Sequence, residues 1–429
     1  MSPGNWRRLG LAVALFFALK MALGAALLIA SARWMPVESF AIFSQLLVFV
    51  AYLSTIGTAG VQNGLIRQIA GAQGDCTAIA GEVRAAVTIW LGFAAIALIG
   101  CWLLDAQIAV LLSGRRGIAG ILPWLALLTV LSGLGQLFCS VLTGTGRAGA
   151  ALMAQGFGLV IGTASALLLL HDGQPLAAAL SFSAGQAITT LIAGAWTGPI
   201  LRRALRIGLG IGPELRRLLA YSGTFLLVAS ILPLTLLGLR SIYRTTAGLE
   251  ALGFWLAANR ISDVNTQLLG LYMVQVFLPG MAGLKDNASA WPLVRQTFLV
   301  GTLAMGAGLV LFLAMPSRLI GLFLSAKFLP ALPIMLGYFL GDTLRVSSSL
   351  AAYSALSRRH LTAYVGFEAA AALLLSITLL LLLHVGAAAA PALAYAGTYA
   401  VMIIPAWWFI RRLLARPQEA SLPDMVLPT

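Results

Sequence analysis

Residues 362–384 read TAYVGFEAAAALLLSITLLLLLH, a run in which Glu368 is the one acidic residue and no lysine or arginine occurs. An α-helix needs about 20 apolar residues to cross the ~30 Å hydrocarbon core of a bilayer. The run is apolar on nearly every side, so it lacks the alternation of apolar and polar residues that transmembrane β-strands show. It therefore predicts a membrane-spanning helix and excludes a transmembrane barrel.

Eleven further segments have the same character, and together the twelve predict an all-α integral membrane protein. The segments, with ends placed to about four residues, are 9–31, 38–66, 84–104, 118–143, 148–170, 175–199, 217–239, 250–279, 294–315, 330–356, 362–384 and 388–410. The composition agrees, since 60% of the 429 residues are hydrophobic, 9% are charged and the mean hydropathy is +0.96. Soluble domains carry about 25% charged residues, which excludes an ordinary cytosolic enzyme and a disordered protein.

The first 32 residues share features with a secretory signal peptide, namely Arg7-Arg8, an apolar run and Ala30-Ser31-Ala32. However, the apolar run is longer than the 7–15 residues of a signal h-region and contains Lys20. We therefore expect it to remain as a helix of the mature protein.

The distribution of basic residues predicts the orientation. The chain has 27 Lys+Arg against 13 Asp+Glu, a net charge of +14, and many basic residues form pairs between apolar segments. With the N-terminus inside, seventeen basic residues lie on the inner side and seven on the outer side. Cytoplasmic loops are enriched in Lys and Arg, so we expect a multi-pass protein of the bacterial inner membrane with both termini cytoplasmic. This pairing does not suit a nucleic-acid-binding face.

Several function classes lack their motifs. Three cysteines and three histidines stand in no metal-binding spacing. The sequence has no Walker phosphate loop, no Asp-rich motif for Mg²⁺ and prenyl diphosphate, and no long outer loop of the kind a membrane polymerase needs. We therefore expect no metal, no cofactor, no direct use of ATP and no enzymatic activity.

The two halves of the sequence correspond at a constant offset. Three pairs of residues in matching positions are separated by 212 residues: Glu38 and Glu250, Ser113 and Ser325, and Arg147 and Arg359. An even number of spans in each half leaves both halves in the same orientation, as in transporters whose substrate path lies between two repeats. We predict a 6+6 repeat around a central cavity, organised as an N-terminal half 1–200, a cytoplasmic linker 201–216, a C-terminal half 217–412 and a disordered tail 413–429.

Six charged residues lie in the interior of the predicted spans, away from the span ends: Lys20, Arg260, Asp263, Asp342, Arg345 and Glu368. Such groups cost about 2.5–3.5 kcal/mol on insertion scales and usually face a partner or a cavity. The spacing of three residues within Arg260/Asp263 and within Asp342/Arg345 also fits pairs that neutralise each other and only hold helices together. Lys20 has no acid on its own segment, which favours a cationic cavity for an anionic substrate such as a diphosphate. Substrate binding is thus assigned to Lys20, Arg260 and Arg345, and ion coupling or charge balance to Asp263, Asp342 and Glu368.

The chain resembles the Wzx-type flippases of O-antigen and enterobacterial common antigen, in the multidrug/oligosaccharidyl-lipid/polysaccharide exporter superfamily. The matching stretches are Phe17-Ala-Leu-Lys20 with Gly24, Ile261-Ser262-Asp263, Phe277-Leu278-Pro279, Leu324-Ser325-Ala326-Lys327-Phe328 and Gly341-Asp342-Thr343-Leu344-Arg345-Val346. Two positions depart from the pattern: Arg345 stands where the family suggests Lys, and Arg260 where it suggests a small polar residue. The likeness is greatest to lipid III flippases.

The resemblance implies a V-shaped exporter of twelve helices with a cationic central cavity. It implies an undecaprenyl-diphosphate-linked oligosaccharide as substrate, and work beside the polymerase and the chain-length regulator of the Wzy-dependent pathway. Independently of the resemblance, the acids Asp263, Asp342 and Glu368 are candidates to bind a coupling proton or sodium ion. A cation-coupled multidrug or small-molecule antiporter of the same superfamily is the alternative. A sugar transporter of the major facilitator class is a weaker one, because residues 67–84 lack that family's compact Gly-Asp-Arg-Gly-Arg loop.

Overall fold

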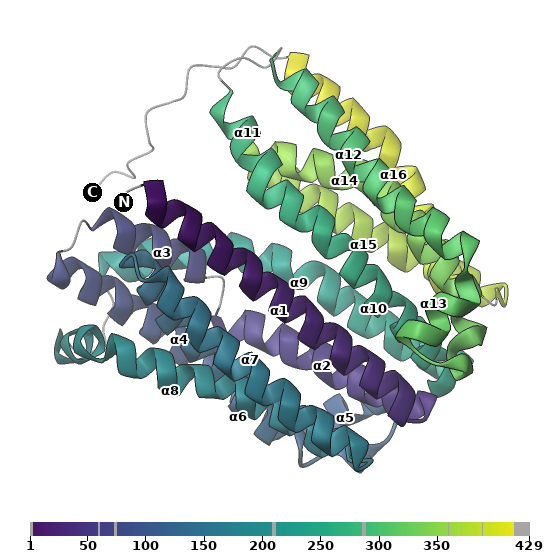
Figure 1. The fold of residues 1–429 in the computed structure, drawn as a ribbon, viewed down its shortest axis with the longest axis horizontal. Coiled ribbons are helices and arrows are strands. Elements are labelled where there is room, and N and C mark those ends of the chain that lie inside the picture. Colours follow the sequence, from purple (N-terminus) through teal and green to yellow (C-terminus); the bar gives the residue numbers. More distant parts are fainter. Residues whose placement is uncertain are drawn as a thin grey trace. The chain divides into compact units, whose positions relative to one another are not determined.

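The computed structural model describes residues 3–58, 61–72, 75–207, 212–284, 289–358, 360–387 and 389–415. This part of the chain is helical and contains no strand (Figure 1). Twelve of its helices have 22 residues or more. They are α1 (Pro3–Trp34), α2 (Val37–Thr58), α4 (Cys76–Leu103), α6 (Leu122–Gly144), α7 (Ala148–His171), α8 (Pro175–Ile207), α9 (Pro213–Ala247), α10 (Leu249–Tyr272), α12 (Ala290–Ala314), α14 (Leu332–Ser357), α15 (Leu361–His384) and α16 (Ala390–Ala415).

Each long helix occupies one of the twelve predicted segments, so the predicted fold class is confirmed. Nine of the twelve are long and apolar enough to cross a membrane over their described residues. The other three are α9, α10 and α14, and the last two carry Arg260, Asp263, Asp342 and Arg345. In α10 and α14 the polar residues that lower the hydropathy therefore include those that the sequence marks as functional.

Two predicted spans each overlap more than one helical element of the structure. Segment 38–66 overlaps α2 and α3 (Val61–Gly71), and residues 59 and 60 between these helices lie outside the description. Segment 250–279 leaves α10 for a π-helical turn, η2 (Met273–Phe277), and then α11 (Leu278–Gly283). Pro279 has no N–H to donate and its ring disturbs the preceding turn, which accounts for the change of helix type. The remaining short elements are α5 (Asp105–Ser113), η1 (Arg116–Ile118), α13 (Pro316–Phe323) and η3 (Ala326–Ala331).

The chain forms two compact units, Met1–Gly253 and Phe254–Thr429. The first unit extends beyond the predicted N-terminal half, because α9 packs against α2, α3, α4 and α5 of that unit. The repeat itself stays a prediction, and Arg359, one member of its third pair, lies outside the described residues. In the predicted linker, α8 continues to Ile207 and α9 begins at Pro213, while residues 208–211 lie outside the description. Residues 413–415 belong to α16 rather than to a tail, and residues 416–429 lie outside the description.

Small residues set the closest helix contacts in each unit. In the first, Gly158 and Gly162 of α7 face Gly185 of α8, and a Cβ on Gly185 would come closer than 3.0 Å to Gly162. Within a bilayer the hydrophobic effect does not drive helices together, so their association depends on van der Waals packing. Glycine surfaces favour this packing because they let two helix backbones approach closely. In the second unit Gly341 of α14 takes the same role against the ring of Tyr395 on α16. This contact places Tyr395 beside the next residue of α14, Asp342.

Candidate functional site

Asp342 is the centre of a polar network in the second unit, and it is fully buried. Its Oδ1 accepts hydrogen bonds from Ser262 Oγ at 2.7 Å and from the Tyr395 hydroxyl at 2.9 Å, and its Oδ2 accepts one from Asn265 Nδ2 at 3.1 Å. The three donors are neutral and come from α10 and α16. A buried carboxylate is costly unless it is hydrogen-bonded, so these donors hold the group and join three helices around it.

Tyr395 connects Asp342 to Arg345. Nη1 of Arg345 donates a long hydrogen bond of 3.4 Å to the Tyr395 hydroxyl, and the guanidinium lies 5.4 Å from the centre of the Tyr399 ring. Within the described residues no carboxylate lies within 4.0 Å of Arg345. The predicted Asp342/Arg345 pair is therefore linked through a tyrosine hydroxyl rather than by direct contact.

A second carboxylate faces the same arginine. Glu368 on α15 interacts electrostatically with Arg345, and also with Tyr353 and Tyr364. Both Arg345 and Glu368 are half-buried. The structure thus brings Asp342, Arg345 and Glu368 into one cluster from α14 and α15, with Tyr395 and Tyr399 of α16 among them.

Arg260 and Asp263 form a separate pair on α10. Nη1 of Arg260 lies 4.0 Å from Oδ2 of Asp263, and Asn259 Nδ2 donates to the other carboxylate oxygen at 2.9 Å. The two side chains are 29% and 47% exposed, in contrast to the enclosed Asp342. Successive helical residues are about 100° apart, so Asp263 points away from the direction in which Ser262 reaches Asp342. The two predicted acids therefore differ in exposure: the side chain of Asp263 is accessible from outside the protein, whereas that of Asp342 is enclosed.

Lys20 lies in the first unit, within the apolar span Leu11–Trp34 of α1. Its side chain is exposed and makes no ion pair or hydrogen bond with the described residues. Leu11, Leu15 and Leu19 form an exposed apolar stripe on the same helix. Lys20 is roughly 140° around the helix from the middle of that stripe. The lysine therefore occupies a different face from the one suited to lipid tails.

Sequence reasoning missed the tyrosines of the network and two crossed ion pairs in the first unit. Tyr395 and Tyr399 could have been noticed as aromatic hydroxyls one helical turn apart in the last span. The crossed pairs join α4 to α9: Arg217 Nη2 lies 2.9 Å from Oε1 of Glu82, and Arg84 Nη2 lies 3.3 Å from Oε2 of Glu214. The available signal was an acid followed two or three residues later by an arginine near the start of each helix, Glu82 and Arg84 on α4 and Glu214 and Arg217 on α9.

Solved structures with the same fold are membrane transporters. An inward-facing multidrug resistance MATE family transporter of the MOP superfamily is 14% identical with a TM-score of 0.77, over 92% of this chain and 94% of that one. The lipid II flippase MurJ in an inward closed conformation is 13% identical with a TM-score of 0.70, over 95% of this chain and 89% of that one. A MOP superfamily transporter from Pyrococcus furiosus, described by the reverse polarity of its binding pocket, is 11% identical with a TM-score of 0.62, over 94% and 95%.

At these identities the structural similarities show the fold alone. It agrees with the fold expected from the resemblance to the exporter superfamily. No curated protein sequence matches the chain. Residues 11–285 match the family described as "Polysaccharide biosynthesis protein". Because this match spans more than half of the sequence, the chain belongs to the family described as "Polysaccharide biosynthesis protein".

Proposed function

We propose that the protein is a flippase for an undecaprenyl-diphosphate-linked oligosaccharide, either an O-antigen unit or lipid III. It moves this lipid from the cytoplasmic to the periplasmic leaflet of the bacterial inner membrane by alternating access of its two halves. The membership in the polysaccharide biosynthesis family and the fold shared with a lipid II flippase support this proposal. The observation that carries it is Lys20, which is exposed in the middle of an apolar helix and has no ion-pair partner among the residues that the structure describes.

A lysine in this position requires a polar surrounding. The cost of placing a charged group at the centre of a span is about 2.5–3.5 kcal/mol on insertion scales, and such groups usually face a cavity or a partner. Lys20 has no partner among the described residues of its own unit, and it is turned away from the leucine stripe of α1. We therefore assign it to a water-accessible cavity, where an ammonium group binds phosphate oxygens by charge-assisted hydrogen bonds.

Arg345 of the second unit is also assigned to substrate binding. Its guanidinium is oriented by two tyrosines instead of being locked in a direct ion pair, so donors remain for a ligand. A guanidinium carries five N–H donors in a planar fork that suits phosphate. Arg260, at 29% exposure, completes the set of cations assigned to the substrate.

Burial divides the acids into two roles. Asp342 is fully enclosed and satisfied by three neutral donors, and Glu368 faces Arg345, so we assign both to charge balance and to holding the arginine. Asp263 is 47% exposed and is the acid that a proton or sodium ion can reach. The coupling ion is therefore assigned to Asp263.

The cellular setting follows from the same proposal. Both termini lie in the cytoplasm, the chain performs no covalent chemistry, and it works beside the polymerase and the chain-length regulator of the Wzy-dependent pathway. Support for this orientation comes from the basic residues, seventeen of which fall on the inner side against seven on the outer side.

A cation-coupled multidrug or small-molecule antiporter is the second candidate. It is favoured by the exposed Asp263, which could attract a cationic drug, and by the fold shared with a multidrug resistance transporter. The test is translocation of fluorescent undecaprenyl-diphosphate sugar in proteoliposomes that contain the full chain. Transport above protein-free vesicles supports the flippase. Absence of transport, together with raised drug resistance in cells that overproduce the chain, would replace it with the antiporter.

A further inference from the structure

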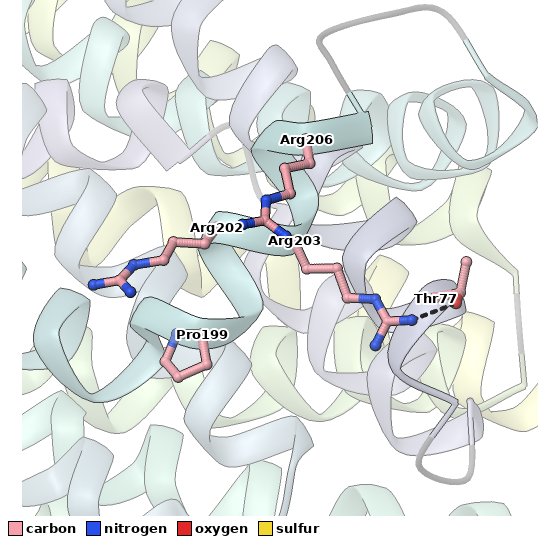
Figure 2. A pocket seen from close by; sticks show the side chains of 5 residues that line it. All are labelled: Thr77, Pro199, Arg202, Arg203 and Arg206. Carbon is pink, nitrogen blue, oxygen red and sulfur yellow. Dashed lines mark hydrogen bonds between the residues drawn. The ribbon is translucent and has the colours of Figure 1, made fainter.

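A basic pocket of about 610 Å³ opens in the first unit where α8 leaves its apolar stretch. Figure 2 shows the side chains that line it, which are Thr77 of α4 and Pro199, Arg202, Arg203 and Arg206 of α8. Nη2 of Arg203 donates a hydrogen bond of 3.3 Å to Oγ1 of Thr77. The Thr77 hydroxyl itself donates to none of the described residues, so its hydrogen is available to a ligand. The Lys20 and Arg345 assignments do not involve this pocket.

The three arginines carry a positive charge that nearby acids do not cancel. Arg202 and Arg206 are four residues apart on one helix, a spacing at which like charges repel. Each acid near this end of α4 and α9 is already engaged. Asp75 caps α4 by accepting hydrogen bonds from the backbone N–H groups of Thr77 and Ala78 at 2.7 and 3.3 Å. Glu82 pairs with Arg217, and Glu214 pairs with Arg84. An anion from outside the chain would therefore relieve the repulsion.

The position of the pocket along α8 indicates the kind of anion. The apolar span on this helix runs from Pro175 to Arg203, so the arginines stand where hydrocarbon gives way to headgroups. Trp196 lies one turn before Pro199, as expected of an aromatic residue at the interface. Its carbonyl accepts a hydrogen bond of 3.3 Å from Nη1 of Arg147, the residue before α7, which adds a fourth guanidinium near this end. Lipid phosphate groups lie at this depth and attract basic residues.

We propose that this pocket binds the phosphate headgroup of a lipid. Arg202, Arg203 and Arg206 supply the charge-assisted hydrogen bonds, and the Thr77 hydroxyl donates a further one. Two lipids offer this chemistry at the same depth: an anionic phospholipid of the bilayer, and a lipid-linked diphosphate. The first source is independent of the flippase proposal, whereas the second rests on it.

The test is lipid binding by the full chain in detergent, followed by native mass spectrometry. The probes are dioleoyl phosphatidylglycerol, undecaprenyl diphosphate and, as a zwitterionic reference, dioleoyl phosphatidylcholine. The variant Arg202→Gln/Arg206→Gln removes two of the pocket's charges, and Arg203→Gln alone is a milder second variant. Arg115→Gln/Arg116→Gln is the matched control, since it removes two exposed arginines of the same unit outside the pocket. Unchanged thermal midpoints establish that the variants are folded.

We expect the affinity for an anionic lipid to fall about fivefold for each pocket arginine removed, with little change in the control. Loss of phosphatidylglycerol binding alone identifies a bilayer phospholipid, and loss of undecaprenyl diphosphate binding alone identifies the lipid-linked source. Loss of both shows one site shared by the two. Unchanged binding of both probes by the pocket variants, or an equal loss in the control, would overturn the proposal.

The outcome is separable from that of the flippase proposal. If the wild-type chain transports the lipid-linked sugar and the Arg202→Gln/Arg206→Gln variant keeps full lipid binding, only the pocket proposal is refuted. If the wild-type chain fails to transport the sugar and the variant loses phosphatidylglycerol binding, only the flippase proposal is refuted.

Discussion

The Tyr395 hydroxyl donates a hydrogen bond of 2.9 Å to Oδ1 of Asp342. The hydroxyl oxygen of Tyr395 also accepts a hydrogen bond of 3.4 Å from Nη1 of Arg345, so a single phenol connects the buried acid to the half-buried arginine. The phenol ring is held in turn by stacking on Tyr338, with ring centres 4.4 Å apart and an angle of 17° between the planes. The orientation of Arg345 thus depends on two uncharged side chains, Tyr395 and Tyr338.

Replacing Tyr395 by Phe tests this relation. The variant keeps the stacking on Tyr338 but removes the hydroxyl, so Asp342 loses one of three donors and Arg345 loses its hydrogen bond. Leaving a buried acceptor short of a partner costs about 1–3 kcal/mol. We expect a lower thermal midpoint and a slower translocation of lipid-linked sugar. Tyr52→Phe, a half-buried tyrosine of the first unit, is the control, and an equal effect there would refute a specific role for Tyr395.

Gly341→Ala tests the close approach of α14 and α16. A Cβ on Gly341 would lie closer than 3.0 Å to the Tyr395 ring, which must then move away from Asp342. Overpacking of this kind costs about 1–3 kcal/mol, more than the gain in helix propensity from Gly to Ala. Gly306→Ala on α12 is matched, because a Cβ there meets nothing within 4 Å. We expect destabilisation in the first variant and none in the second; equal thermal midpoints would contradict the packing argument.

The sequence predicted the class of fold well because its cause is local. Runs such as 362–384 must form helices in a bilayer, since each backbone polar group has to be satisfied within its own segment. The same local reasoning did not predict the π-helical turn Met273–Phe277, which precedes Pro279 within the span 250–279. A proline in the sequence indicates where the regular i→i−4 hydrogen bonds of a helix are interrupted, but not which helix type the adjacent turn adopts.

The candidate site was predictable only in part, because its geometry depends on contacts between distant helices. The spacing of Asp342 and Arg345 suggested a direct ion pair. In the structure both side chains instead hydrogen-bond to the hydroxyl of Tyr395, which is 53 residues from Asp342 in the sequence. The spacing of Arg260 and Asp263 did correspond to a contact of 4.0 Å, since both residues lie on one helix. Intrahelical spacing therefore locates candidate charges, whereas the identity of their partners requires the packed structure.

The crossed ion pairs between α4 and α9 predict a marked difference between two neighbouring arginines. Arg217→Ala leaves the buried carboxylate of Glu82 without its cation, while Arg216 is exposed and makes no ion pair within the described residues. Because the Arg217 side chain is 54% exposed, we expect a loss of only about 1–2 kcal/mol, below that of a fully buried pair. Arg216→Ala should change the unfolding free energy by less than about 0.5 kcal/mol. Thermal unfolding of both variants in detergent measures the difference, and equal midpoints would show that the pair contributes nothing.

The two acids of α10 and α14 should respond differently when neutralised. Asp342→Asn places an amide N–H₂ against a set of donors, so we expect destabilisation of about 1–3 kcal/mol and loss of transport. Asp263→Asn keeps an acceptor for Asn259 at an exposed position, so the fold should persist. If Asp263 binds the coupling ion, the dependence of translocation on pH or sodium should disappear in that variant. A preserved ion dependence in Asp263→Asn would remove Asp263 from the coupling role.

Lys20→Ala gives the most direct test of the substrate assignment. Lys20 packs against no described carboxylate and is exposed, so its removal should leave membrane insertion and thermal stability unchanged. Loss of a charge-assisted contact to a diphosphate should slow translocation about tenfold or more. Lys20→Arg preserves the charge and should retain much of the activity. Two controls separate charge from position: Leu15→Ala alters the apolar stripe of the same helix, and Lys327→Ala removes a lysine from η3, outside the long helices. Normal transport by Lys20→Ala would show that the lysine serves another purpose and that the diphosphate is bound elsewhere.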